Sequence, residues 1–174
     1  MRAFDETGVM DRLRQLDGDL FALFGGARRF ELVIVGGSAL MVQGLLPHAR
    51  ATRDIDVLRT ASEVEELLAR YDMNTDVATF LYRYPQGWEE RKVRVPFEGD
   101  ALDVYTLSNE DLAITKLLSW RAVDQSDLRA MKNGGGIDFG KLRGILDDAL
   151  EVRVNLEDAA WEQLLAHVVE LEAW

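Results

Sequence analysis

Apolar residues recur at every third or fourth position near the start of the sequence, which is the spacing of one face of a helix. The stripe consists of Val9, Leu13, Leu16, Leu20 and Phe24. Gly25 and Gly26 follow this stripe and are expected to end the helix. The segment from Asn155 onward has the same spacing. The pattern therefore predicts one amphipathic helix near each end of the sequence.

Between these helices the pattern changes to short runs that are typical of strands. Residues 30–35, FELVIV, are almost continuously apolar and rich in β-branched side chains, which predicts a strand buried on both faces. Residues 54–58, DIDVL, alternate instead, so Ile55 and Val57 are expected on the face opposite to the two aspartates. Residues 101–107, ALDVYTL, predict a further strand.

Turn and capping residues indicate the remaining elements. Residues 36–46, GGSALMVQGLL, turn from the first strand into a short helix. Residues 77–84 and 91–97 alternate on either side of a Pro-Gln-Gly turn, which predicts a hairpin. Two pairs with the spacing of a capping box are expected to open further helices. These pairs are Ser62 with Glu65 and Ser108 with Asp111.

Together these elements predict an α/β (α+β) fold. The expected architecture is a small mixed β-sheet of about five strands, flanked by N-terminal and C-terminal helices. The length of 174 residues suits a single domain. Its core is expected at about residues 28–108, and its helical C-terminal part at about 109–174.

Charge and composition narrow the range of partners. The chain has 31 acidic and 20 basic side chains, a net charge of −11, so its surface as a whole should repel nucleic acid. It has no cysteine, which excludes disulfides and thiolate metal sites. It shows neither the apolar core of a secretion signal nor an apolar run of about 20 residues. We expect a soluble, cytoplasmic protein with no membrane partner.

A glycine turn after the first strand is the first candidate for chemistry. Gly36, Gly37 and Ser38 follow the buried strand and begin the short helix. Free backbone N–H groups at such a turn suit a phosphate, and glycines allow a triphosphate to approach the backbone closely. The Ser38 hydroxyl would add a donor. A double glycine is also often only a tight turn between a strand and a helix.

Two aspartates follow on the next strand. Asp54 and Asp56 are two positions apart and therefore project from the same face of that strand. Carboxylates that converge in this way favour a cation, and Mg²⁺ (or Mn²⁺) is the natural one beside phosphates. Asp103, between apolar neighbours on the strand at 101–107, is expected to complete the catalytic and metal-binding group. A solvent-facing strand residue is the alternative for Asp103.

The order of these motifs resembles the nucleotidyltransferase superfamily that includes DNA polymerase β. VGGSALMVQ, RATRDIDVL and LDV carry the resemblance, and Arg50 and Thr52 match the R-x-T-x-D-I-D form of the toxin-type bacterial branch of AbiEii and MenA proteins. The resemblance implies transfer of a nucleoside monophosphate from a nucleoside triphosphate to a hydroxyl. Arg53, beside the first aspartate, is either a phosphate contact or an ordinary surface arginine.

The same branch carries a lysine, an arginine and an acid-x-x-acid pair after the third carboxylate. Here the corresponding residues are Lys116, Arg121, Asp124 and Asp127. The resemblance implies that Lys116 contacts the triphosphate. An ion pair of Lys116 with Asp111 or Glu110 is the alternative. The other three residues are equally compatible with a structural salt bridge.

The function that these observations favour is a magnesium-dependent nucleotidyltransferase. The resemblance leaves RNA, a protein or a small molecule as the hydroxyl acceptor, and it suggests a toxin-antitoxin system with an antitoxin partner or a homodimer. The alternative is a catalytically weak or inactive module of the same fold that binds a nucleotide or a partner. The best local candidate for an RNA contact is a basic cluster on the expected hairpin. It consists of Arg83, Arg91, Lys92 and Arg94.

Overall fold

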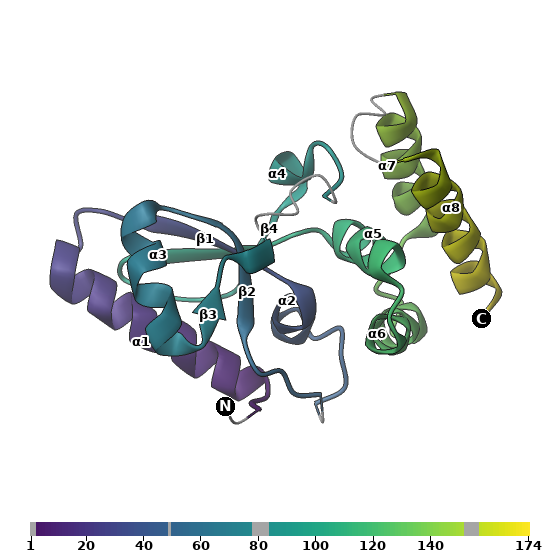
Figure 1. Ribbon diagram of the computed structural model, residues 1–174. Coiled ribbons are helices and arrows are strands. Elements are labelled where there is room, and N and C mark those ends of the chain that lie inside the picture. The colour runs from purple at the N-terminus through teal and green to yellow at the C-terminus, as the bar shows by residue number, and fades with distance from the viewer. Residues whose placement is uncertain (1–2, 49, 78–83, 152–156) are drawn as a thin grey trace. The chain divides into compact units, whose positions relative to one another are not determined.

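The computed structural model describes residues 3–48, 50–77, 84–151 and 157–174 (Figure 1). The chain forms two compact units that alternate along the sequence. We call Met1–Thr79 with Lys92–Leu107 the sheet unit, and Phe80–Arg91 with Ser108–Trp174 the helical unit. The last boundary between the two units lies between Leu107 and Ser108.

A five-stranded mixed sheet forms the centre of the sheet unit, in the order β3-β2-β1-β5-β4. The central strand β1 runs antiparallel to β2 and parallel to β5. The outer strands are short; β3 is parallel to β2 and β4 is antiparallel to β5. The bounds are β1 Phe30–Val35, β2 Ile55–Thr60, β3 Met73–Asn74, β4 Val93–Arg94 and β5 Leu102–Thr106. The expected fold class is confirmed.

Helix α1, Glu6–Phe24, runs along one side of this sheet (Figure 1). The Asp5 side chain accepts a hydrogen bond from the Gly8 backbone and opens the helix, and Gly25 ends it with a φ of 70°. The predicted stripe is buried apart from Phe24, which stays 38% exposed. The sheet unit also contains α2 Gly36–Val42, α3 Ser62–Leu68 and the short 3₁₀ helix η1 Ala69–Tyr71.

A buried carboxylate joins α1 to the start of β5. The Asp17 side chain accepts hydrogen bonds from the backbone N–H groups of Asp100, Ala101 and Leu102, at 2.8 to 3.0 Å. Bonds of this kind to a charged acceptor are about twice as strong as neutral ones. They satisfy backbone donors of the segment that leads into the strand carrying Asp103.

One local prediction in this part of the chain was wrong, and another falls largely outside the described residues. Helix α3 has Ala61 at its N-cap position without a side-chain cap bond, and Ser62 instead bonds the neighbouring Glu63, so the expected capping box is absent. In the described part of the expected hairpin, residues 88–91 form a short helix and β4 pairs with β5. Most of its first arm, residues 78–83, lies outside the described residues.

The helical unit contains five helices among its described residues. Helix α5 begins as predicted, since the Ser108 hydroxyl accepts a hydrogen bond from the Asp111 N–H. Trp120 caps the end of this helix. Its ring stacks on those of His167 and Trp174, with 3.9 and 5.5 Å between the ring centroids. No helix in the described ranges is long and apolar enough to cross a membrane. The bounds are α4 Trp88–Arg91, α5 Asn109–Ser119, α6 Ala122–Asn133, α7 Phe139–Glu151 and α8 Asp158–Ala173.

Candidate nucleotide and metal site

The glycine turn and the acidic strand meet in the sheet unit. Strand β1 passes directly into α2, and Gly36 takes a φ of +67° at this junction. A Cβ atom placed on Gly36 would lie 2.8 Å from Oδ2 of Asp56. A glycine is therefore required here by both the backbone conformation and the close approach of the carboxylate.

Replacing Gly36 with alanine is expected to destabilise the protein and displace the Asp56 carboxylate. The left-handed backbone alone costs a non-glycine residue about 1–2 kcal/mol. Urea unfolding of Gly36→Ala measures the loss. Gly37→Ala is the matched variant, because its Cβ would meet only Nη2 of Arg50, at an ordinary 4.0 Å. Equal losses in the two variants would contradict this explanation.

Asp56 also has a neighbour that the sequence patterns did not indicate. Asn74 on β3 pairs directly with Asp56, and its Nδ2 lies 3.4 Å from Oδ1 of the aspartate. The Asn74 amide is oriented by the Asp76 N–H, which donates to its Oδ1 at 3.0 Å. Asp56 therefore has one carboxylate oxygen facing an amide donor and the other facing Gly36.

Asp54 is held beside the start of β2 by the segment before it. The Thr52 hydroxyl donates to the Asp54 carbonyl at 3.0 Å, and the Thr52 backbone pairs with that of Phe4 through two hydrogen bonds. Asp54 is half-buried, as is Asp56, whereas Ile55 and Val57 are fully buried. The predicted division of this strand into an acidic and an apolar face is confirmed. Arg53 is exposed.

The Ser38 hydroxyl bonds within the protein. Its Oγ donates to the Val35 carbonyl at 3.0 Å, and the residue is 2% exposed. A hydroxyl has a single proton to donate. In this structure that proton stabilises the passage from β1 to α2 instead of pointing to solvent, so the expected donation from Ser38 to a phosphate would require this bond to break.

Asp103 lies on the same sheet as the other two aspartates but away from them. Asp56 is opposite Val35 at the end of β1, whereas Asp103 is opposite Glu31 near its beginning. Four residues of strand correspond to about 13 Å at ~3.3 Å per residue. Strand β1 also lies between the two strands that carry them. The structure therefore does not bring the expected third carboxylate to Asp54 and Asp56.

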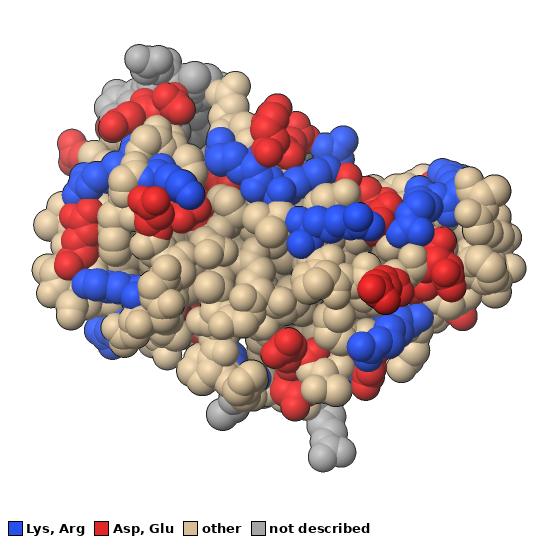
Figure 2. Space-filling view, turned by 180° about the vertical axis from the view of Figure 1, so that it is seen from behind, with Lys and Arg blue, Asp and Glu red and all other residues tan. Residues whose placement is uncertain are grey.

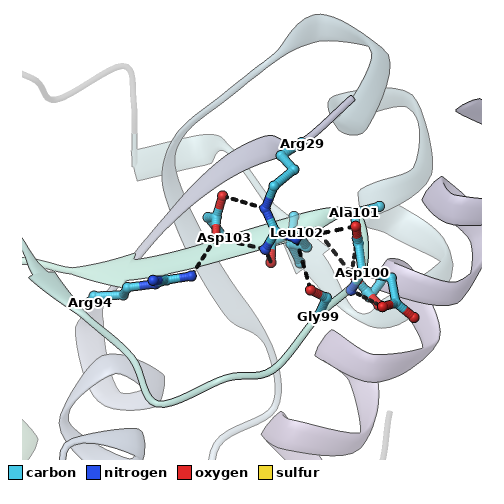
Figure 3. Close-up of polar contacts among 8 residues, drawn as sticks. Arg29, Arg94, Gly99, Asp100, Ala101, Leu102 and Asp103 are labelled. Carbon is cyan, nitrogen blue, oxygen red and sulfur yellow. Dashed lines mark hydrogen bonds and ion pairs between the residues drawn. The ribbon is translucent and has the colours of Figure 1, made fainter. Parts of the chain in front are cut away.

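Two arginines instead approach Asp103 from opposite sides (Figure 3). Arg29 donates to both carboxylate oxygens at 2.8 and 2.7 Å, and Arg94 donates to Oδ1 at 2.7 Å. Arg29 further donates to the carbonyls of Gly99, Asp100 and Leu102. The hydrogen bonds from Arg29 hold the pKa of Asp103 below its ordinary value, although partial burial acts in the opposite direction.

This lowered pKa predicts how Asp103→Asn changes the pH dependence of stability. A carboxylate with a depressed pKa in the folded state adds stability above its unfolded pKa of about 3.9, and this stability is lost as the pH falls through the folded pKa. The wild type should therefore be more stable than Asp103→Asn at pH 6, and the difference should shrink as the pH falls below about 4. Thermal unfolding across this range measures it, and a difference independent of pH would contradict the ion-pair assignment.

The acidic pair suits a hard divalent cation that completes its coordination with other ligands. Mg²⁺ is commonly bound by one or two carboxylates together with phosphate oxygens and water. Asp54 and Asp56 provide such a donor set. In the described part of the chain, no three acidic or histidine side chains come together as a complete metal-binding group. The residues present therefore fit a metal that arrives with a phosphate ligand.

Lys116 belongs to a buried charge network in the helical unit. It is 6% exposed, and its Nζ donates to Asp127 at 2.7 Å and to Asp124 at 3.3 Å. Arg121 donates to Asp124 at 2.7 Å. Burial raises the pKa of Asp124, but the bond from Arg121 and the charge of Lys116 outweigh it, so the pKa lies below its ordinary value.

Lys116 therefore forms ion pairs, as the alternative interpretation expected, but its partners are Asp124 and Asp127 in α6. Asp111, one of the two expected partners, instead accepts both of its ion-pair bonds from Arg91, at 2.7 and 3.0 Å. Glu110, the other, accepts a bond from the Asp138 N–H. The salt-bridge alternative for Arg121, Asp124 and Asp127 is present in the structure.

The basic cluster proposed for RNA is largely paired with acids. Arg91 bonds Asp111, while Lys92 and Arg94 bond Glu31 and Asp103. Arg83 lies outside the described residues. Figure 2 shows the same mixture over one side of the molecule, where Lys and Arg side chains are interspersed with Asp and Glu. Such a surface provides little net attraction for a nucleic-acid backbone.

The strand, glycine turn, helix and acid-x-acid strand of the sheet unit together define a nucleotidyltransferase-like class of protein. Residues 11–172 match the model of the family described as "Nucleotidyltransferase of unknown function (DUF6036)", and the chain belongs to this family. No curated protein and no solved structure was found to match it. The match supports the superfamily resemblance, while membership of the narrower toxin-type branch stays a prediction.

Proposed function

We propose that the protein transfers a nucleoside monophosphate from a nucleoside triphosphate to a hydroxyl acceptor in a metal-dependent reaction. The observation that carries this proposal is the contact between the glycine turn and the acidic strand, where Asp56 lies against Gly36. Membership of a nucleotidyltransferase family supports it. The contact would place phosphates near the turn, beside Asp54 and Asp56 at the start of β2.

The residues of this site divide into two groups with different tasks. Gly36 and Gly37 leave the backbone open to the triphosphate, because neither carries a side chain. Asp54 and Asp56 would hold Mg²⁺ or Mn²⁺, and Asn74 would keep the Asp56 carboxylate in orientation. The metal would supply neutralisation of phosphate charge and polarisation of the phosphate that is attacked.

The proposed reaction is a displacement at the α-phosphorus. The acceptor oxygen forms a bond to this phosphorus, the bond to the oxygen that bridges the α- and β-phosphates breaks, and pyrophosphate and the hydroxyl proton are released. The site as proposed needs neither Asp103, which bonds two arginines, nor Lys116, which bonds two buried carboxylates. The superfamily resemblance, in contrast, implies that Asp103 belongs to the catalytic group and that Lys116 contacts the triphosphate.

The acceptor proposed from charge is a protein side chain or a small hydroxyl compound rather than bulk RNA. The net charge of −11 opposes a polyanion, and the basic cluster considered for RNA is paired with acids where it is described. A role in a toxin-antitoxin pair, with an antitoxin or a second copy of the chain as partner, is part of the same proposal.

The test is incorporation of label from nucleotides. The protein is incubated with Mg²⁺ and each of the four ribonucleoside triphosphates labelled at the α-phosphate, alone, with total RNA and with a lysate. We expect metal-dependent transfer from at least one triphosphate to an acceptor. The proposal fails if no α-phosphate label is transferred and no triphosphate binds in the presence of Mg²⁺ or Mn²⁺.

A second function is favoured by the position of Asp103. A nucleotide-binding module without turnover would retain the glycine turn and the acidic pair but would not need a third carboxylate close to them, which is the arrangement observed. The same experiment separates the two functions. Binding of a triphosphate without transfer of label to any acceptor supports the module.

A further inference from the structure

An arginine lies next to the glycine turn, and it is not the one that adjoins the first aspartate in sequence. Nη2 of Arg50 is 4.0 Å from the position that a Cβ on Gly37 would occupy. Arg50 is half-buried, whereas Arg53 is exposed. The structure therefore places the Arg50 guanidinium beside the turn that the proposed function assigns to the triphosphate.

Local hydrogen bonds hold this arginine in position. The Arg50 N–H donates to the Pro47 carbonyl at 2.9 Å, and Nη1 donates to the Ala51 carbonyl at 3.1 Å. Two residues further on, Thr52 is anchored by two backbone hydrogen bonds with Phe4, at 2.8 and 2.9 Å. These bonds hold the Arg50 backbone and that of the residue two positions after it.

The same anchor gives a physical reason for the R-x-T-x-D spacing. Thr52 is tied to Phe4 through its backbone and to the Asp54 carbonyl through its hydroxyl. The anchored Thr52 thus lies midway between Arg50 and Asp54 and holds the Asp54 backbone. An arginine suits phosphate because its planar group can donate two parallel hydrogen bonds to it.

We propose that Arg50 binds the phosphate groups of the nucleoside triphosphate at the glycine turn. This inference rests on the proposed function, since it assigns a further residue to the same site. The competing role is that of a counter-ion, in which Arg50 only offsets the charges of Asp54 and Asp56. The two roles differ in their response to Arg50→Lys. Lysine keeps the charge that a counter-ion supplies, so a counter-ion role predicts unchanged triphosphate affinity, whereas loss of the planar group weakens binding if Arg50 contacts the phosphates directly.

The experiment measures binding by isothermal titration calorimetry with the full chain at a fixed Mg²⁺ concentration. The probes are the four ribonucleoside triphosphates and inorganic triphosphate, which reports on phosphate contacts without a base. Arg50→Gln is expected to weaken the binding of every probe that the wild type binds by about 10- to 100-fold, the range for loss of charge-assisted hydrogen bonds. Arg50→Lys, which keeps the charge but not the planar group, should lose less.

Two further variants separate this role from a general effect of charge. Arg14→Gln removes the same charge from an exposed arginine of the sheet unit that pairs with Asp11, and it should bind each probe as the wild type does. Arg53→Gln tests the assignment made from sequence proximity. Far-ultraviolet circular dichroism verifies that each variant is folded, and if Arg50→Gln does not fold, Arg50→Lys decides.

Each outcome has a distinct meaning. Wild-type triphosphate affinity in Arg50→Gln or in Arg50→Lys overturns the inference and leaves the proposed function standing. A larger loss of triphosphate affinity in Arg53→Gln than in Arg50→Gln also overturns the inference and assigns the phosphate contact to Arg53. Absence of binding to the wild type overturns both the inference and the proposed function. A loss of triphosphate affinity confined to the Arg50 variants supports both the inference and the proposed function.

Discussion

Replacing Asp56 with asparagine is expected to lower nucleotide transfer by about a thousand-fold or more. Asparagine keeps the size of the side chain but removes its charge, so the effect isolates the carboxylate. A metal contributes several kcal/mol to the stabilisation of a charged transition state, and each ~1.4 kcal/mol corresponds to a tenfold change in rate. The measurement is the rate of label transfer at saturating metal, with the affinity for Mn²⁺ measured alongside.

Asp11→Asn is the matched control for Asp56→Asn, because it removes the same charge from an exposed aspartate of the sheet unit. Its transfer rate should equal that of the wild type. Asp103→Asn provides a separate comparison. A fall in transfer as large as that of Asp56→Asn would mean that the carboxylates act together in catalysis, which contradicts the assignment of Asp103 to an arginine pair.

A second large effect is expected on stability when Lys116 is replaced with methionine. The substitution leaves Asp124 and Asp127 buried, at 1% and 2% exposure, without the cation that lies between them. Removal of one partner from a buried ion pair typically costs about 3–5 kcal/mol. Asp124 keeps its bond from Arg121, so the expected loss lies near the lower end, at about 3 kcal/mol. Urea unfolding followed by circular dichroism should show this loss.

The comparison for Lys116→Met is Arg143→Gln, which breaks a pair on the surface of the same unit. Arg143 donates to Glu172 at 2.5 and 2.9 Å but is 50% exposed, and solvent screening leaves exposed pairs with little effect on stability. The triple variant with Lys116→Met, Asp124→Asn and Asp127→Asn should recover part of the loss. Stability of Lys116→Met within 1 kcal/mol of the wild type would contradict the assignment.

Local periodicity was sufficient to predict the elements that carry the site. The strand at residues 30–35 is β1 with the same bounds, and the alternation that separates Ile55 and Val57 from the aspartates matches their complete burial. These features depend on which neighbours a residue has along the chain. A two-residue repeat determines the face of a strand, and a stripe every third or fourth position determines the face of a helix.

Contacts between distant parts of the chain could not be predicted in this way. The alternation around Asp103 indicated its face, but its distance from Asp56 depends on strand order and register, which the sequence pattern does not specify. Its principal partner, Arg29, is 74 residues away in sequence. Asn74 and Arg50 reach the glycine turn and its acidic neighbour through tertiary packing. Asn74 belongs to no motif, and the motif that includes Arg50 did not indicate a contact with the glycine turn.

The division into two units has a practical consequence for spectroscopy. All four tryptophans, at positions 88, 120, 161 and 174, belong to the helical unit, and the sheet unit with the candidate site has none. Intrinsic tryptophan emission therefore reports on the helical unit alone. A tryptophan introduced at the exposed Phe21 of α1, in a variant whose four native tryptophans are replaced by phenylalanine, would supply an optical signal from the unit that carries the candidate site.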